Sequence, residues 1–247
     1  ILIHNDMNNI LKYLTEEKKL TLTGGLYQTT QVAFALNSHN IVKERVNERQ
    51  VQHIFDSRFI TDKEEDVAVD FDDMIEISNH FTAFDYVLDS VNEPLSVQII
   101  RDLHRMLKMN TTPVARGWLI LGQWKRLSNK VEEAETTPPK SVNTKINSLN
   151  EWYNSLPEIG TEHIIEYHYR FEKIHPFQAG SGRVGRLLMF RECLRNNIMP
   201  FIIKQTQRKE YYLGFRDDIS YLPYLSKLCA EGQEQYTNWV KYFYGEV

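Results

Sequence analysis

The chain has 247 residues, of which 42% are apolar and 25% charged, and its 13 Tyr, 12 Phe and 4 Trp exclude a disordered chain. Its formal net charge of −4 argues against a nucleic-acid partner, because no basic surplus is available to neutralise phosphates. The apolar runs stay far below the roughly 18 residues that a membrane helix needs, so no membrane partner is expected.

Apolar residues recur every three or four positions along most of the chain, which predicts amphipathic helices with one buried face. In chain order, the predicted helices cover residues 71–91, 97–107, 142–153, 164–174 and 187–198. Pro200 is expected to end the last of them. Residues 118–139 contain Gly122 and the pair Pro138 and Pro139, break the helical period, and predict a short β-hairpin or extended flap. The predicted fold class is all-α.

The two cysteines, Cys193 and Cys229, both lie in stretches with helical apolar spacing. Free thiols in such stretches behave as small core residues, and their reduced state is typical of proteins inside the cell. We therefore expect a cytoplasmic protein, of bacterial source, without disulfide bonds.

One segment, residues 175–186, departs from the helical pattern and carries polar chemistry: His-Pro-Phe-Gln-Ala-Gly-Ser-Gly-Arg-Val-Gly-Arg. Pro176 blocks continuation of the preceding helix, and a Gly-x-Gly turn opens the next helix near Gly182. Such a turn exposes amide hydrogens at the positive end of a helix dipole, and its glycines let an anion approach closely. The segment is therefore a candidate phosphate cradle.

Two arginines and a histidine flank this cradle. Arg183 and Arg186 lie three positions apart on the first turns of the new helix, so both can lean toward one anion. His175 precedes the cradle, and an imidazole with an ordinary pKa near 6.5 can take a proton from a hydroxyl at neutral pH. A base beside a polyphosphate site indicates nucleotidyl or phosphoryl transfer.

The segment resembles the signature loop of the Fic family, whose pattern is His-Pro-Phe-x-(Asp/Glu)-Gly-Asn-(Gly/Lys)-Arg-x-x-Arg. The matching residues are His175, Pro176, Phe177, Gly180, Gly182, Arg183 and Arg186. The resemblance extends over about residues 24–217, including residues 122–139, which are similar to the family's flap. It implies a Fic-like helical domain over residues 67–247, with a short β-hairpin flap, and an N-terminal helical extension over residues 1–66.

The resemblance also implies an activity, protein adenylylation. His175 would deprotonate a Ser, Thr or Tyr hydroxyl of a target protein, which then attacks the α-phosphate of ATP with pyrophosphate leaving. The phosphates would be held by Gly180, Ser181, Gly182, Arg183 and Arg186. Tyr211 and Tyr212 are possible contacts to adenine or ribose, with packing an equal alternative. The flap would add the target's extended segment as a strand through Val131, Glu132, Glu133, Ala134, Glu135 and Thr136. Possible partners include the protein itself, as automodification target or in a homodimer.

Two positions of the loop differ from the family pattern. Ala179 replaces the acidic residue that holds Mg²⁺ or Mn²⁺ in the family, and a methyl group cannot ligate a hard cation. Ser181 replaces the usual Asn and keeps one short hydroxyl donor for the α-phosphate. We therefore expect no metal ligand at position 179, and an adenylylation activity that is weakened or needs unusually high metal.

A third departure concerns an inhibitory motif of many Fic proteins, (Ser/Thr)-x-x-x-Glu-(Gly/Asn), whose Glu pairs with the second signature arginine. The corresponding helix here would carry Ser38, which fits, and Val42, which stands where the Glu is expected. Because valine cannot pair with Arg186, inhibition by this route should be absent or slight.

Two alternatives remain open from the sequence. Loss of the metal ligand could leave a nucleotide-binding regulatory module without catalysis. The phosphate cradle also says little about the base, so a transferase with another phosphate-containing donor, such as UMP, phosphocholine or phosphate donors, remains possible.

Overall fold

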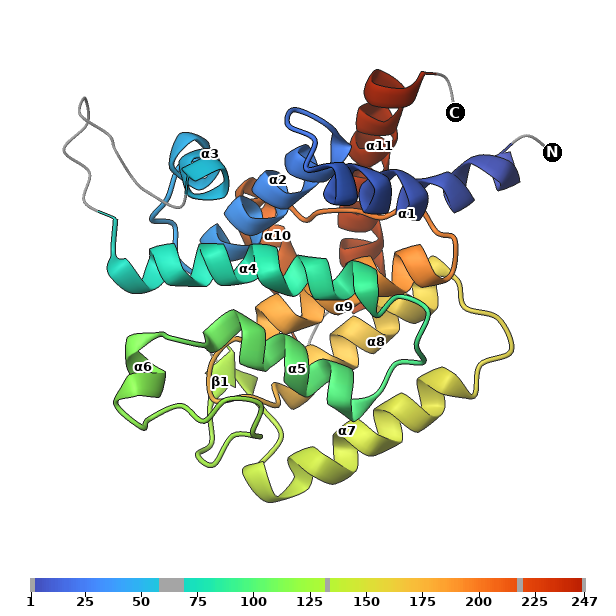
Figure 1. The fold of residues 1–247 in the computed structure, drawn as a ribbon. Helices are drawn as coiled ribbons and strands as arrows, with labels where there is room; N and C mark the ends of the chain where they lie inside the picture. Colours follow the sequence, from blue (N-terminus) through green and yellow to red (C-terminus); the bar gives the residue numbers. More distant parts are fainter. Residues whose placement is uncertain (1–2, 58–68, 132–133, 217–219, 246–247) are drawn as a thin grey trace.

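Figure 1 shows the fold in a computed structural model that describes residues 3–57, 69–131, 134–216 and 220–245. The α-helices are α1 Ile3–Leu20, α2 Leu26–Asn40, α3 Glu48–Ser57, α4 Phe71–Asp89, α5 Val97–Lys108, α6 Thr112–Ala115, α7 Pro139–Asn154, α8 Thr161–Ile174, α9 Ser181–Arg195, α10 Arg208–Leu213 and α11 Tyr221–Tyr244. A 3-10 turn covers Gln205–Gln207, and two strands, β1 Lys130–Val131 and β2 Ala134–Glu135, pair antiparallel. The predicted all-α fold with a short hairpin flap is confirmed.

The helix starts follow from residues that satisfy the free amide groups of a first turn. The side chain of Asp70 accepts a hydrogen bond from the amide of Asp72 at the start of α4. At the start of α5, Ser96 accepts one from Ile99. Helix α7 begins with Pro139, whose missing N–H costs nothing at that position.

The prediction that Pro200 ends the signature helix was wrong, because α9 already ends at Arg195. Asn197 adopts a left-handed φ of 53°, which asparagine tolerates better than most residues. The amide of Ile198 then donates to the carbonyl of Cys193 at 2.8 Å, which closes the helix in a Schellman motif. In the sequence, the helical spacing of apolar residues continues past Asn197, so it gave no indication that the helix ends at Arg195.

Helix α9 forms the centre of the molecule, with α4 and α5 on one side and α8 on another (Figure 1). Thirteen of its fifteen residues are buried, so it has no solvent-facing stripe. The ring of Phe190 packs against Phe34 of α2, Phe84 of α4 and Tyr236 of α11. This aromatic group joins the N-terminal, central and C-terminal helices into one core. Cys193 and Cys229 are buried and free, as expected.

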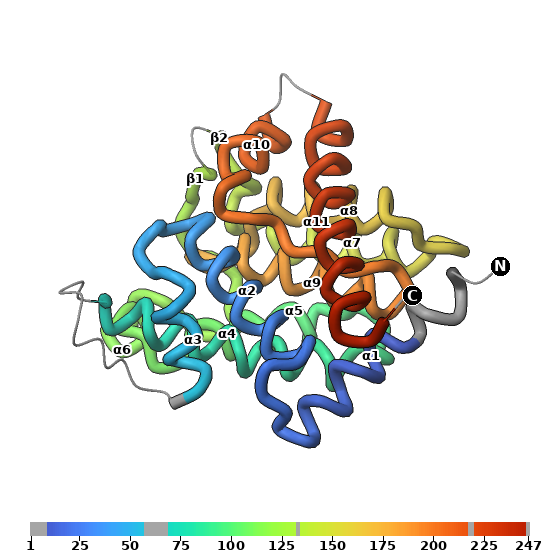
Figure 2. The backbone as a smooth tube through the Cα atoms, turned by 90° about the horizontal axis from the view of Figure 1, so that it is seen from above, coloured from blue at the N-terminus to red at the C-terminus, as the bar shows by residue number. Residues whose placement is uncertain are grey.

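The N-terminal helices pack directly on the central ones. Figure 2 shows α2 passing over α4 toward α9, and α2 contacts α4, α9 and α11. A second apolar cluster, which includes Val32, Val51 and Ile77, fastens α3 to α2 and α4. The predicted boundary between residues 66 and 67 lies outside the described residues, and the division into 1–66 and 67–247 stays a prediction. Among the described helices, none combines the length and apolarity needed to cross a bilayer.

A fully buried arginine ties α9 to the connection between α4 and α5. Arg191 is 0% exposed, and its guanidinium donates to the carbonyls of Ser90 and Glu93 and to the hydroxyl of Ser90. It also pairs with the neighbouring buried carboxylate of Glu192. A buried guanidinium is stabilised only when such partners replace its water, so this network fixes how α9 meets the connection.

Replacing Arg191 should therefore destabilise the whole fold. Arg191→Met would leave the buried carboxylate of Glu192 with only the more distant, partly exposed Arg195 at 4.0 Å, and we expect the free energy of unfolding to fall by about 3–5 kcal/mol. Arg191→Lys should restore little of it, because an ammonium cannot make the same forked contacts. Urea unfolding followed by circular dichroism measures the change, with the exposed Arg116→Met as control. Equal unfolding midpoints for the two methionine variants would contradict the prediction.

Candidate active site

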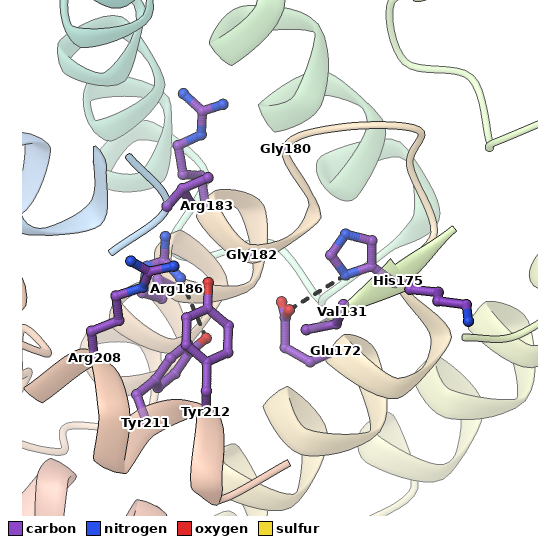
Figure 3. A pocket seen from close by; sticks show the side chains of 12 residues that line it. Val131, Glu172, His175, Gly180, Gly182, Arg183, Arg186, Arg208, Tyr211 and Tyr212 are labelled. Carbon is purple, nitrogen blue, oxygen red and sulfur yellow. Dashed lines mark hydrogen bonds and ion pairs between the residues drawn. The ribbon is translucent and has the colours of Figure 1, made fainter. Parts of the chain in front are cut away.

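The signature loop opens into a cavity of about 280 Å³ between the end of α8, the start of α9, the hairpin and α10 (Figure 3). The described residues that line it are Val42, Lys130, Val131, Glu172, His175, Gly180, Gly182, Arg183, Arg186, Arg208, Tyr211 and Tyr212. The structure thus brings together the predicted histidine, both arginines, two of the cradle's three residues and one flap residue. It adds Glu172, Lys130 and Arg208, which sequence reasoning missed.

The loop places His175 by backbone geometry. His175 caps α8 in a left-handed conformation with φ 45°, which is strained for a residue other than glycine. Its amide closes the last turn of α8 by donating to the carbonyl of Phe171 at 2.9 Å, and Pro176 then prevents further helix. The imidazole is directed into the cavity, where Nδ1 lies 3.6 Å from a carboxylate oxygen of Glu172 (Figure 3).

A stacked pair of rings anchors the middle of the loop. Phe177 is fully buried and stacks on His104 of α5, with ring centroids 3.9 Å apart. Nε2 of His104 lies 3.1 Å from the carbonyl of Ala179, and its Nδ1 accepts from the amide of Gly122. Burial lowers the pKa of His104 to about 3, so the ring is neutral and has one donor and one acceptor for these two contacts.

The cradle itself is made of backbone rather than of the serine hydroxyl. Gly180 precedes α9 with φ 95°, a conformation that only glycine adopts freely. The first amides of α9, beginning with Ser181, have no acceptor within the helix and carry its positive dipole end. The hydroxyl of Ser181 is buried and accepts from the amide of Phe177 at 3.0 Å. It is therefore turned into the loop, and a contact of this hydroxyl with an α-phosphate stays a prediction.

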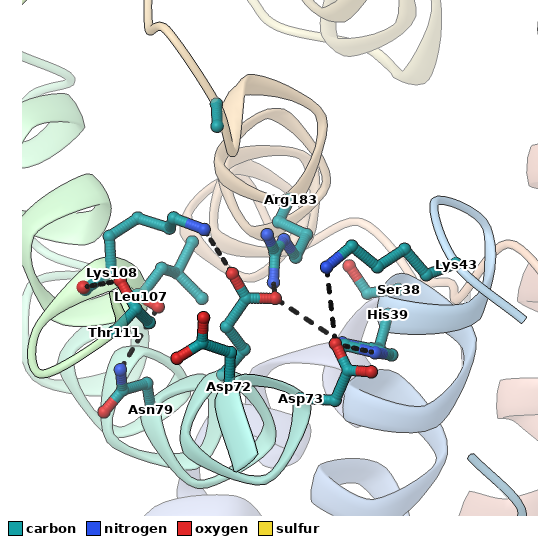
Figure 4. A network of polar contacts seen from close by, with 12 residues as sticks. Ser38, His39, Lys43, Asp72, Asp73, Asn79, Leu107, Lys108, Thr111 and Arg183 are labelled. Atoms are coloured by element: carbon teal, nitrogen blue, oxygen red, sulfur yellow. Dashed lines mark hydrogen bonds and ion pairs between the residues drawn. The ribbon is translucent and has the colours of Figure 1, made fainter. Parts of the chain in front are cut away.

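The first signature arginine, Arg183, lies in a buried ionic network (Figure 4). Nη1 of Arg183 is 2.6 Å from Glu76 of α4, and Lys108 of α5 pairs with the other oxygen of that carboxylate. Burial raises the pKa of Glu76, but the charges of Arg183 and Lys108 outweigh it and hold this pKa well below its usual value. Nε of Arg183 is buried without a hydrogen-bond partner among the described residues, so the guanidinium keeps an unused donor.

The second signature arginine, Arg186, is held by α2. Nε donates to the hydroxyl of Ser38 at 3.1 Å and Nη2 to the carbonyl of Ser38 at 2.7 Å. Ser38 therefore meets Arg186, a contact that the sequence did not predict. Val42 lies in the turn after α2 rather than on the helix, is 44% exposed, and lines the same cavity. The expected helix over the whole motif was wrong, because α2 ends at Asn40.

The two tyrosines of α10 have different environments. Tyr211 is 1% exposed, and its hydroxyl lies 2.8 Å from Nε2 of His168 and 3.3 Å from Nη1 of Arg186. A ring so enclosed supports Arg186 by packing and hydrogen bonding, which is the alternative role that the sequence left open. Tyr212 is half-buried and lines the cavity, so it is the better candidate for contact with a base.

The flap is fastened to the loop by side chains that sequence reasoning missed. The ammonium of Lys125 is buried and donates to Asn129, Thr136 and the carbonyl of Ile174. Asn129 in turn donates to the carbonyl of Phe177 at 3.0 Å. Thr136 is thus part of the anchor.

The structure describes only some of the other predicted flap residues. Val131 lines the cavity, and Ala134 and Glu135 form β2 opposite β1. Glu132 and Glu133 lie outside the described residues.

The donor set does not fit the divalent metal that the resemblance implies. The side chain of Ala179 offers no ligand, and among the described lining residues one carboxylate, Glu172, faces four cationic side chains. A second buried group, His39, Asp73 and Glu76, has ligand atoms within 4.8 Å of one another. Arg183, Lys108 and Lys43 already neutralise its carboxylates (Figure 4). We derive no step through a metal ion.

Comparison with known proteins agrees with this geometry. A profile of the Fic/DOC family matches residues 94–193, which hold α5, the flap, α7, α8 and most of α9. Residues 94–193 are thus similar to the Fic/DOC family domain. A Fic domain containing signaling protein from Bacteroides thetaiotaomicron has the same fold, with a TM-score of 0.78 at 20% identity, covering 99% of this chain and 98% of that one. Fic-1 from C. elegans superposes with a TM-score of 0.70 at 18% identity, over 96% of this chain and 71% of that one.

The similar curated sequences carry the name protein adenylyltransferase Fic. The protein of Nematostella vectensis is 28% identical over 194 residues, which are 69% of this chain and 44% of the relative. That of Drosophila erecta is 29% identical over 171 residues, 66% of this chain and 32% of the relative. The chain spans less than half the length of these relatives. The similarity thus covers about two thirds of this chain, while an activity of the whole chain is a matter for proposal.

Close packing of α8 against α9 in the Fic domain depends on Gly185. A Cβ at this position would lie 2.8 Å from Oε1 of Glu172 and 2.9 Å from Nδ1 of His168, both on α8. At Gly182 the corresponding contact is 3.2 Å, to the flexible end of Arg186. The buried carboxylate and imidazole therefore occupy space that only a glycine at position 185 leaves free.

Gly185→Ala should lower stability, although alanine in an ordinary helix is favoured over glycine by about 1 kcal/mol. The new methyl group must displace Glu172 and His168, and overpacking of this kind costs about 1–3 kcal/mol. Thermal unfolding should show a lower midpoint for Gly185→Ala than for Gly182→Ala, its neighbour on the same helix. A midpoint above that of the unsubstituted protein would refute the close approach.

Proposed function

We propose that the chain is a protein adenylyltransferase that moves AMP from ATP to a hydroxyl side chain of a target protein. His175 takes the proton of a Ser, Thr or Tyr hydroxyl, and the oxygen forms a bond to the α-phosphorus of ATP. The bond from that phosphorus to the bridging oxygen breaks, and pyrophosphate leaves with the electron pair. The target then carries AMP through a phosphodiester bond.

One observation carries this proposal: the imidazole of His175 and the guanidinium groups of Arg183 and Arg186 line one cavity at the N-terminus of α9. Exposed amides and two guanidinium groups at that end of a helix are suited to a chain of phosphates. A base within the same cavity can activate the attacking oxygen. The names of the curated relatives support the same reaction.

The charge of the cavity favours a highly charged donor. Four cationic side chains, Lys130, Arg183, Arg186 and Arg208, face one carboxylate among the described lining residues. Such a surplus attracts a nucleoside triphosphate more strongly than a singly charged ligand. Tyr212 and Val131 offer half-buried surface for a base, which supports ATP as donor without selecting it over UTP.

The hairpin supports a target presented as an extended segment. Strands β1 and β2 are only two residues long each, and a segment that adds as a strand would pair with main-chain groups at their edge. Val131, Ala134, Glu135 and Thr136 are the described residues that we propose for this contact. Automodification, a homodimer and a cytoplasmic setting remain predictions from the sequence.

Replacing His175, the proposed general base, should abolish the transfer of AMP. We expect His175→Ala to lose at least about 100-fold of AMP attachment, because no other described group takes its place in the cavity. Intact-mass measurement after incubation with ATP and Mg²⁺, with and without chelator, detects the adduct. His163→Ala, near the start of α8, is the control. A protein that ATP stabilises thermally but that acquires no adduct would instead be the nucleotide-binding module.

A carboxylate at position 42 should inhibit the enzyme. Val42 lines the cavity that holds Arg186, so Val42→Glu would place a negative charge where a phosphate must bind. We expect automodification to fall about tenfold, since a charge-assisted contact is worth about 1.5–3 kcal/mol. Val42→Gln, which has the same size without the charge, should stay near the unsubstituted rate. Equal rates for the Glu and Gln variants would count against this placement.

A further inference from the structure

A buried carboxylate lies directly behind the histidine of the proposed reaction. Glu172 is on α8, one helical turn before His175, and is 7% exposed. Its Oε2 lies 3.6 Å from Nδ1 of His175, and Figure 3 shows the two side chains directed toward each other across the cavity wall. This separation is slightly longer than a hydrogen bond, and such contacts in active sites often tighten when substrate binds.

The surroundings of Glu172 leave this carboxylate few other partners. Neither its Oε1 nor Nδ1 of His175 has a hydrogen-bond partner among the described residues. Burial raises the pKa of Glu172, but neighbouring His175, His168 and Arg186 outweigh burial and lower this pKa below its usual value. The group is therefore ionised at neutral pH, which is costly in a buried position unless a charge on His175 or Arg186 compensates it.

The glycines of α9 make room for this arrangement. A Cβ at Gly185 would meet Oε1 of Glu172 at 2.8 Å, and one at Gly182 would lie 3.6 Å from Oε2. The carboxylate thus sits against the first two turns of α9. This position suits a role toward His175 better than a role as ligand for a metal at the phosphates.

The other charged groups of the cavity are cationic, and two of them, Arg183 and Lys130, pair with Glu76 and Glu135. Arg183 and Arg186 of α9, Lys130 of β1 and Arg208 of α10 line the same cavity, as do the phenols of Tyr211 and Tyr212. Glu172 is the one acid among the described lining residues. Among these lining residues, Glu172 is therefore the carboxylate in contact with the imidazole of His175.

We infer that Glu172 is the positioning residue of His175, an inference that rests on the proposed adenylyl transfer. The carboxylate accepts the hydrogen of Nδ1 and so fixes the tautomer whose lone pair is on Nε2. When Nε2 takes the proton of the target hydroxyl, the imidazolium is stabilised by the adjacent negative charge. Glu172 keeps its ionised form throughout, and the proton remains on Nε2 until it passes to solvent.

The decisive variant is Glu172→Gln, which keeps the size of the side chain and removes its charge. In the unliganded protein, we expect the imidazole pKa of His175, followed by NMR and assigned with His175→Ala, to fall by about one unit. Glu172→Asp, which keeps the charge, should retain more of the original pKa than Glu172→Gln. Glu166→Gln, on the same helix and outside the cavity, should leave it unchanged.

Enzyme kinetics supply the second measurement. Glu172→Gln should lower kcat for AMP transfer about 10- to 100-fold and change KM for ATP by less than about twofold. The acidic limb of its pH–rate profile should move down by the same one unit or so, because the neutral imidazole then persists to lower pH. A merely structural role would lower the thermal midpoint and the rate without moving this limb.

The two measurements separate the two proposals. If the unsubstituted protein transfers AMP but the imidazole pKa is the same in the Gln, Asp and unsubstituted proteins, the inference on Glu172 is overturned alone. If no AMP is transferred, the proposed function fails, while the NMR titration still decides whether Glu172 controls His175. Should Glu172→Gln not fold, the Asp variant is judged instead, and an unchanged pKa together with an unchanged rate would overturn the inference.

Discussion

The burial of α9 together with three of its arginines is the constraint on which the rest of the structure depends. A guanidinium removed from water costs several kcal/mol unless partners replace the lost contacts, so each arginine dictates what must surround it. Arg183 requires Glu76 of α4, Arg186 requires Ser38 of α2, and Arg191 requires the carbonyls between α4 and α5. These polar contacts fix the positions of the helices around α9 as specifically as the apolar contacts do. They also explain why helices from the N-terminal third of the chain reach the signature loop, which lies more than a hundred residues later.

The same constraint shapes the chemistry of the cavity. Two of the three arginines lie at the N-terminus of α9, where the helix dipole disfavours cations. Their protein partners satisfy only part of each guanidinium, since Nε of Arg183 has no hydrogen-bond partner among the described residues. An anion bound at this end of α9 would therefore interact favourably with the helix dipole, with the exposed amides and with the unused guanidinium donors. The fold holds two arginines near the positive end of the α9 dipole, and a bound phosphate would offset this unfavourable interaction between like charges.

How much of this the sequence could predict depends on how local each feature is. The loop at residues 175–186 was predictable because Pro176 and the glycines act on their own backbone, and the structure has the expected stop, turn and helix start. The end of α9 was not, because the Schellman motif at Asn197 competes with an apolar spacing that continues past it. Glu76 and Glu172 gave no signal, since one pairs with a residue about a hundred positions away and the other resembles an ordinary helix carboxylate. Ser38 was assigned only through the resemblance to the Fic family, because no local rule connects it to Arg186.

The features that break local rules are gathered at the cavity rather than spread over the fold. His175 adopts a left-handed backbone conformation, Glu172 is a buried carboxylate with an unpaired oxygen, and Gly185 weakens the middle of a helix. Each costs about 1–3 kcal/mol on its own. They are mutually dependent, because Gly185 admits Glu172, and the left-handed turn brings the imidazole of His175 back over that carboxylate. A Cβ at position 185 would meet both Glu172 and His168, so the glycine cannot be replaced while these two side chains keep their places. The retention of all three features at one cavity is what the proposed role of His175 as a base would require of the fold.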